Sequence, residues 1–353
     1  MNQLPEQTPG SPERGFQHLQ RQSLPGSAIS VPALGISSKL TDNNKFSTLE
    51  ISATEASSLA RKLGSSLLDF RFDCNGHVVG DVTITDRQIS SLNNEQLIVR
   101  IGLPPAQKSE DTLHSDLFSY EGVLRAYQRI RELLPDRKPD FLLLEGVASL
   151  FNSDLQNELY FSIAMQGALQ AMQELRAARD VSCIGLVADH AEYLQRALQH
   201  GDWDFFVLNH RYTLLEQWPL FNLLPECQQT STTVMVGHPF NTGILRGVNR
   251  WNFTTPADFV NARVENIRHI CRLHEIPVEA AALQLPAAHP AVSTVLIDTD
   301  THSLKAAEQI LQWQSLPIPE SLWDDLKLGG VLHEEAPVPA HRSGSQQKTG
   351  TQG

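Results

Sequence analysis

The feature that most constrains this chain is a series of short apolar runs separated by helical patterns. Several of these runs lack the alternation of apolar and polar residues that marks a half-buried strand. Continuous apolar runs of this length are typical of strands that are buried on both faces. The runs lie at residues 33–36, 66–70, 97–103, 140–146, 182–188, 204–210, 233–240 and 293–299.

Helical patterns lie between these runs, at residues 53–64, 119–134, 154–179 and 257–275. Ser119 is a suitable N-cap for the second of them. Strands that alternate with helices form βαβ units and a parallel sheet. The sequence therefore predicts an α/β fold, and eight strands favour a (β/α)8 TIM barrel.

A doubly wound sheet is the alternative architecture. Such a sheet usually has a Gly-rich turn after its first strand, and residues 34–40 contain no such turn. Residues 1–25 and 337–353 are poor in large apolar side chains, so we expect both to be disordered tails. The prediction is a single barrel over residues 26–336.

Composition narrows the function classes. The 353-residue chain has a formal net charge of −12, so no overall positive field attracts nucleic acid or anionic lipid. No apolar run approaches the ~20 residues of a membrane helix, and the N-terminus lacks the pattern of a secretory signal. The four cysteines lie far apart, which argues against disulfides and a zinc site. We expect a cytoplasmic protein with a small-molecule ligand, and the sequence leaves a protein partner open.

Extended segments of the chain are more specific than these patterns. FSYEGVLRAYQRIRELL (118–134), GALQAMQELRAARDVSCIGL (167–186), RYTLLEQ (211–217) and GHPFNTGIL (237–245) follow one another in this order. They resemble the aldo/keto reductase superfamily, and within it the D-threo-aldose 1-dehydrogenase branch, which includes L-fucose and L-galactose dehydrogenases. The resemblance extends over roughly residues 20–340 and implies the same barrel fold.

The resemblance also implies a site. Aldo/keto reductases bind NAD(P)H across the C-terminal mouth of the barrel and transfer hydride to a carbonyl or from a sugar hemiacetal. Their catalytic residues are an Asp, a Tyr, a Lys and a His. The Tyr is the general acid, and the Lys–Asp pair tunes its pKa, because a phenol with a pKa of ~10 does not readily release its proton near neutrality.

This chain departs from that set of four. Asp69, in the segment DFRFDCNGH (69–77), falls on the family Asp, and the Tyr position falls on Cys74 or Asn75. Arg100 falls on the Lys and Glu145 on the His. One of the four catalytic residues therefore matches.

The replacements leave two interpretations open. Asp69, Arg100 and Glu145 could form a structural ion-pair network. They could equally do acid–base chemistry, with Glu145 as the acid and Asp69 ionised beside Arg100. Cys74 could be a thiol whose pKa Arg100 lowers, or an apolar filler. Asn75 can donate hydrogen bonds but supplies no proton.

Residues implied in cofactor binding are partly retained. Tyr212 resembles the ring that stacks under nicotinamide, and Asn241 and Gly243 lie where the family cradles the pyrophosphate. Each could instead maintain the fold. Asp189 stands where the family has an Asn that touches the carboxamide.

The loop after the last strand also differs from the family. Asp298 falls on a Gly and Asp300 near an Arg that holds the adenosine ribose or its phosphate. Two carboxylates would repel a 2′-phosphate, so NADP is disfavoured. NAD could still contact an Asp through its ribose hydroxyls. The loop could also be solvated, with no cofactor bound.

Three functions follow from these observations. The first is a diverged enzyme that acts on a small polar or sugar-like metabolite through Asp69, Arg100 and Glu145. The second is a pseudoenzyme, a non-catalytic barrel that binds a metabolite or a protein. The third is an NAD(P)-dependent oxidoreductase with another proton donor.

Overall fold

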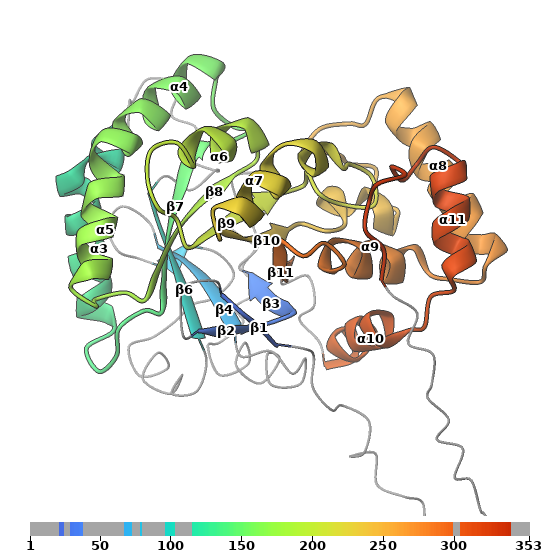
Figure 1. Ribbon diagram of the computed structural model, residues 1–353, viewed down its shortest axis with the longest axis horizontal. Coiled ribbons are helices and arrows are strands. Elements are labelled where there is room, and N and C mark those ends of the chain that lie inside the picture. The colour runs from blue at the N-terminus through green and yellow to red at the C-terminus, as the bar shows by residue number, and fades with distance from the viewer. Residues whose placement is uncertain are drawn as a thin grey trace, which may run out of the picture.

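A ring of parallel strands surrounded by helices forms the body of the protein (Figure 1). The computed structural model describes residues 21–24, 29–37, 67–72, 78–79, 96–102, 115–298 and 304–339. The strands of the ring are β3 (Leu34–Ser37), β4 (Leu67–Phe72), β6 (Gln96–Gly102), β7 (Phe141–Ala148), β8 (Cys183–Ala188), β9 (Phe205–Asn209), β10 (Thr233–Gly237) and β11 (Val292–Asp298).

The ring closes between its first and last strands. Each neighbouring pair is parallel, from β4 through β6, β7, β8, β9 and β10 to β11. Strand β3 then pairs with β11, Leu34 opposite Val295, and with β4, Ile36 opposite Leu68. The predicted (β/α)8 barrel is confirmed, and the doubly wound alternative is wrong because an open sheet has no such closing pair. Each of the eight apolar runs is a strand of the ring.

Helices cover the outside of the ring. The predicted helix at 53–64 lies outside the described residues, and the other three are present. The helical segments are η1 (Ser115–Phe118), α3 (Tyr120–Leu133), α4 (Asp154–Ile163), η2 (Ala164–Ala168), α5 (Leu169–Ala177), α6 (Ala191–Ala197), η3 (Trp218–Phe221), α7 (Leu223–Gln229), η4 (Asn241–Arg246), α8 (Asp258–Leu273), α9 (Val278–Ala287), α10 (Leu304–Ser315) and α11 (Glu320–Leu328).

Local sequence signals explain how two of these helices are placed. The Ser119 hydroxyl accepts a hydrogen bond from the Gly122 N–H at 3.0 Å and caps α3, as predicted. Helices α4 and α5 form one continuous rod that contains the π-helical turn η2. Gly167 in this turn lies so close to α3 that a Cβ there would be 2.7 Å from the Tyr120 nitrogen. The two helices therefore pack backbone to backbone at this point.

A short antiparallel hairpin lies at the N-terminal end of the barrel. It consists of β1 (Arg21–Ser23) and β2 (Ser30–Pro32). Leu24 and Val31 are almost fully buried against the first residues of the barrel strands. Residues 21–24 therefore belong to the folded unit rather than to the N-terminal tail predicted for 1–25, because Leu24 gains more from burial than a polar tail residue would.

Two apolar clusters form the core. One fills the space between the strands and the helices, and the other fills the barrel interior. The interior cluster includes Leu67, Ile98, Phe141, Leu143, Cys183, Val187, Phe205, Val207, Met235 and Leu296. This barrel is thus packed rather than hollow, and space for chemistry remains only at its ends. Among the described helices, none has the length and apolar character needed to span a bilayer.

Candidate active site

Five polar side chains extend the inward-facing rows of the barrel at the carboxyl ends of its strands. Each lies two residues beyond an apolar residue of the interior cluster, and alternate residues of a strand face the same side. The C-terminal mouth is therefore polar where the interior is apolar. These buried residues are Asp69, Arg100, Glu145, Asp189 and Asn209.

Arg100 is the centre of a buried ion-pair triad. Its Nε donates to both carboxylate oxygens of Asp69, at 2.7 and 2.9 Å, and its Nη2 also donates to Asp69 Oδ2. On the other side, Nη1 donates to Glu145 Oε1 at 2.8 Å. The exposed fractions of Asp69, Arg100 and Glu145 are 2, 2 and 4%. The structure therefore brings together the three residues that the sequence predicted as a cluster.

The triad is electrostatically coupled. Burial alone would lower the pKa of the Arg100 guanidinium, but the charges and hydrogen bonds of Asp69 and Glu145 outweigh burial and raise this pKa. The contact with Asp69 uses the two-pronged geometry of a guanidinium, which a lysine ammonium cannot reproduce. Arg100 is thus a fixed cation that orients two carboxylates and takes no part in proton transfer.

An irregular backbone positions Glu145. Between Leu144 and Ala148, strand β7 advances four residues while β8 advances two, which is a β-bulge. Gly146 follows Glu145 with a φ of +90°. Gly102, opposite Glu145 on β6, has a φ of +111°, and a Cβ there would lie 2.2 Å from the Glu145 carbonyl oxygen. Bulges of this kind re-aim side chains at barrel rims.

Three predicted site residues are not tested by these contacts. Cys74 and Asn75, the candidates for the Tyr position, lie outside the described residues, as does Asp300. Asp298 ends β11 in register with Ser37 of β3. The assignment of the Tyr position to Cys74 or Asn75 and the discrimination against NADP therefore stay predictions.

Three of the residues expected to contact a cofactor lie after β9 and β10. Tyr212 is fully buried, with its ring edge-on to His289 at 5.5 Å, and burial raises the pKa of its hydroxyl. The Asn241 Nδ2 donates to the His210 carbonyl at 2.9 Å and to Glu216 Oε1 at 3.3 Å. Gly243 has a φ of +98°, which favours glycine. Tyr212, Asn241 and Gly243 thus shape this part of the mouth.

Asp189 forms hydrogen bonds to neighbouring segments at the barrel mouth. Its carboxylate accepts hydrogen bonds from the Leu150 N–H at 3.0 Å and from Asn209 Nδ2 at 3.1 Å. Its carbonyl accepts one from Arg211 Nε at 2.7 Å. These contacts link the loop after β7, the end of β8 and the end of β9, so Asp189 has a structural role here.

Sequence reasoning missed a pair of stacked histidines. His210 and His238 immediately follow β9 and β10, and their rings stack at 4.2 Å with an interplanar angle of 13°. Both have left-handed backbone conformations, with φ of +63° and +53°. Burial, His238 and Arg211 hold the pKa of His210 well below its usual value. The only signal in the sequence was a histidine directly after each of two adjacent strands.

Several buried polar atoms in this region have no hydrogen-bond partner among the described residues. They are both ring nitrogens of His210, the Tyr212 hydroxyl and Asn241 Oδ1. Such atoms typically cost about 1–3 kcal/mol each. They fit a polar ligand such as the carboxamide and phosphates of a nicotinamide cofactor. Because Tyr212 and Asn241 are fully buried, binding there requires neighbouring side chains to move.

Comparison of the sequence with known proteins points to one family. Residues 88–327 match the Aldo/keto reductase family. Pyridoxal 4-dehydrogenase from Microbacterium luteolum is 28% identical over 244 residues, which are 65% of this chain and 70% of that protein. D-threo-aldose 1-dehydrogenase from a Pseudomonas species is 30% identical over 169 residues, which are 46% of this chain and 51% of that protein.

Solved structures agree on the fold. The holo form of aldo-keto reductase AKR11C1 from Bacillus halodurans superposes with a TM-score of 0.62 at 15% identity, covering 92% of this chain and 99% of that one. Its apo form gives a TM-score of 0.60 at 16% identity, with the same coverage. At this identity the likeness concerns the barrel alone, while the family match extends over most of the sequence. The chain belongs to the aldo/keto reductase family.

Proposed function

We propose that this protein is an oxidoreductase that oxidises a small polar aldehyde or a sugar-like hemiacetal, with Glu145 as the proton acceptor. The observation that carries the proposal is the buried triad, in which Arg100 holds Glu145 at the mouth of the barrel through a 2.8 Å hydrogen bond. The two relatives are named as dehydrogenases of pyridoxal and of D-threo-aldoses, which supports the direction of the reaction.

The chemistry of the triad favours oxidation over reduction. Reduction of a carbonyl needs a group that donates a proton, whereas oxidation of a hydroxyl needs one that accepts it. Arg100 donates to Glu145 Oε1 at 2.8 Å and fixes the orientation of this carboxyl group. A carboxylate accepts a proton, so Glu145 is suited to take the hydroxyl proton of a hemiacetal. Asp69 contributes by fixing the plane of Arg100.

Aldo/keto reductases generally use a nicotinamide nucleotide. When bound, its oxidised form, NAD(P)+, would accept the hydride in the oxidation proposed here. In this chain Tyr212 and Asn241 are suited to hold such a cofactor, because each has a buried polar atom without a partner among the described residues. In the proposed oxidation the hydroxyl proton of the substrate passes to Glu145, and the hydride on the carbon that bears this hydroxyl would go to the oxidised nucleotide. For an aldehyde, the hydroxyl belongs to its hydrated or cyclic form.

The test is nucleotide reduction by the purified protein with a D-threo-aldose or with pyridoxal. We expect Glu145→Gln to lower kcat/KM by about 100-fold or more while the fold is kept. Glu158→Gln is a matched control, because Glu158 pairs with Arg196 on the surface. Unchanged turnover in Glu145→Gln would contradict the assignment.

A second function is favoured by the complete burial of Tyr212 and Asn241. If the neighbouring side chains do not open, the barrel binds a metabolite or a protein without hydride transfer. Calorimetric titration with NAD(H) and NADP(H) separates the two functions. Micromolar binding of either nucleotide supports the oxidoreductase, and no binding at millimolar concentration supports the non-catalytic barrel.

A further inference from the structure

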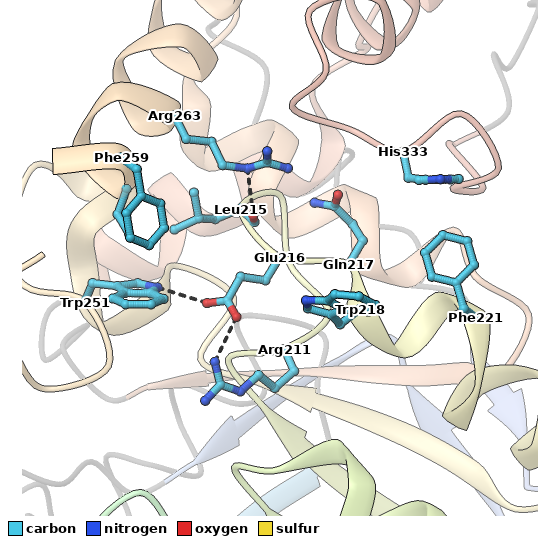
Figure 2. Close-up of a pocket in the computed structure, with 11 residues that line it drawn as sticks. Arg211, Leu215, Glu216, Gln217, Trp218, Phe221, Trp251, Phe259, Arg263 and His333 are labelled. Atoms are coloured by element: carbon cyan, nitrogen blue, oxygen red, sulfur yellow. Dashed lines mark hydrogen bonds and ion pairs between the residues drawn. The ribbon is translucent and has the colours of Figure 1, made fainter. Parts of the chain in front are cut away.

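A groove with aromatic walls lies outside the barrel mouth (Figure 2). Its volume is about 510 Å³, which is within the usual range for small-molecule sites. Trp251 and Phe259 line one side, and Trp218 and Phe221 line the other. Trp218 and Phe259 are 76 and 70% exposed. Exposed aromatic side chains around a concave surface mark a binding site rather than a core.

The polar groups of the groove carry a net positive charge. Arg211 pairs with Glu216, Nη1 to Oε2 at 2.8 Å, so these two charges cancel. The second oxygen of Glu216 accepts from Trp251 Nε1 at 2.9 Å. Glu216 is therefore fully engaged, and the remaining charge in the groove belongs to Arg263.

Arg263 has only neutral partners among the described residues. Its Nε donates to the Leu215 carbonyl at 3.0 Å, Nη1 to the Gly330 carbonyl at 3.2 Å and Nη2 to the Val331 carbonyl at 2.7 Å. These contacts fix the guanidinium plane and use three of its five N–H groups. Within the described part of the chain, no carboxylate forms an ion pair with it. Burial lowers the pKa of Arg263, and the nearby charge of Glu216 offsets this effect only in part.

We propose that this groove is a second ligand site, specific for a planar aromatic molecule with one carboxylate. The ring lies between the aromatic walls, and the carboxylate accepts the two remaining N–H groups of Arg263. A single negative charge matches the one net positive charge that Arg211, Arg263 and Glu216 leave in the groove. A polyanion is disfavoured more than a monoanion, because the formal net charge of −12 opposes the approach of each negative charge.

This site does not depend on the proposed oxidoreductase activity. The residues that would bind the ligand are Arg263 and the four aromatic side chains, and none of them belongs to the Asp69–Arg100–Glu145 triad. Removal of the triad is therefore expected to leave groove binding unchanged. Failure of one proposal is thus distinguishable from failure of the other.

The probe for the test is 2-naphthoate, compared with its neutral amide, 2-naphthamide. Both probes absorb and fluoresce in the range of tryptophan, so their binding is measured by isothermal titration calorimetry. We expect saturable 1:1 binding of naphthoate with a Kd of about 1 mM or tighter. We also expect the naphthamide to bind at least about tenfold more weakly, because it lacks the charge that meets Arg263.

Two variants separate charge recognition from aromatic packing. Arg263→Gln should remove the preference for naphthoate over naphthamide, whereas Arg272→Gln, exposed on the same helix, should keep it. Arg263 also donates a hydrogen bond to the Val331 carbonyl, so its loss could disturb the local backbone. A second variant that leaves Arg263 in place therefore tests the groove independently. Phe259→Ala, at an exposed position, should weaken both probes equally. Equal binding of the two probes to the unmodified protein, or binding of neither at millimolar concentration, would overturn the proposal.

Discussion

At the scale of single residues, Arg100 is a buried cation whose desolvation must be offset by nearby carboxylates. A guanidinium that is 2% exposed is stable only while its carboxylate partners remain. The same residue cannot give up its proton, so its effect on chemistry must act through Glu145. The stability of the barrel mouth and the reactivity of Glu145 therefore depend on the same hydrogen bonds, those of the Asp69–Arg100–Glu145 triad.

Replacing Asp69 by Asn tests this demand. The change leaves Arg100 with Glu145 as its only charged partner in the triad, so we expect the free energy of unfolding to fall by about 3–5 kcal/mol in urea titrations. Asp116→Asn is the control, because Asp116 forms a solvent-exposed pair with Arg125 at 3.4 Å. That pair should contribute less than about 1 kcal/mol. Similar losses in both variants would show that the triad is not a buried ion-pair network.

Two glycines with positive φ separate steric conflict from backbone strain. Gly102→Ala places a Cβ 2.2 Å from the Glu145 carbonyl oxygen, and we expect a loss of about 3 kcal/mol or more. Gly330 has a φ of +66°, and a Cβ there would meet no atom of the described residues within 4 Å, so Gly330→Ala should cost about 1 kcal/mol. Thermal unfolding of the two variants measures the difference. Equal costs would mean that contact with β7 does not matter.

At the scale of elements, the strands were predictable and their irregularities were not. Several barrel strands carry a continuous apolar run because helices cover one face and the interior cluster the other. The bulge at Glu145 depends on the register between β7 and β8, which no local sequence pattern predicts. The π-helical turn η2 also lies at a contact between elements, where α3 comes close to Gly167.

The hairpin of β1 and β2 contributes to stability through Leu24. This side chain is 1% exposed, and its truncation to Ala should cost about 2–5 kcal/mol. Leu155→Ala makes the same change on α4 at a side chain that is 80% exposed, and should stay within about 0.5 kcal/mol. Chemical denaturation of both variants gives the comparison. A neutral Leu24→Ala would mean that the hairpin does not seal the barrel.

At the scale of the whole molecule, two buried histidines link stability to pH. Burial lowers the pKa of His289 to about 4, and the pKa of His210 is also well below its usual value. Because these pKa values are lower in the folded than in the unfolded chain, the unfolded chain binds more protons below about pH 6.5. Stability is therefore full above that pH and falls as the pH approaches 4.

Replacing His289 by Asn tests this link. In the native protein, His289 alone should account for roughly 3 kcal/mol of the loss between pH 6.5 and 4. The variant keeps an acceptor near the Ala291 N–H, which His289 Nδ1 occupies at 3.1 Å, but it does not titrate. We expect a shallower decline of the free energy of unfolding over this range. An unchanged slope would assign the acid sensitivity to other groups.

The sequence could locate a site residue only where its place along a strand determines its place in the barrel mouth. The family resemblance located Asp69, Arg100 and Glu145, and in the structure each lies two residues beyond an interior apolar residue. The stacking of His210 on His238 could not be predicted, because two non-glycine residues adopt left-handed backbones there. The burial of Tyr212 depends on packing across several loops, which the sequence alone does not encode.

Closure of the barrel joins residues from opposite ends of the chain, with Leu34 opposite Val295 and the Thr294 hydroxyl bonded to the Pro32 carbonyl. During biosynthesis, β3 emerges long before its partner β11 exists. At about 5–20 residues per second, the wait is roughly 13 to 50 s. Throughout that time the nascent chain presents an unpaired strand edge. We therefore expect the growing polypeptide to bind chaperones that cover such edges until translation is nearly complete.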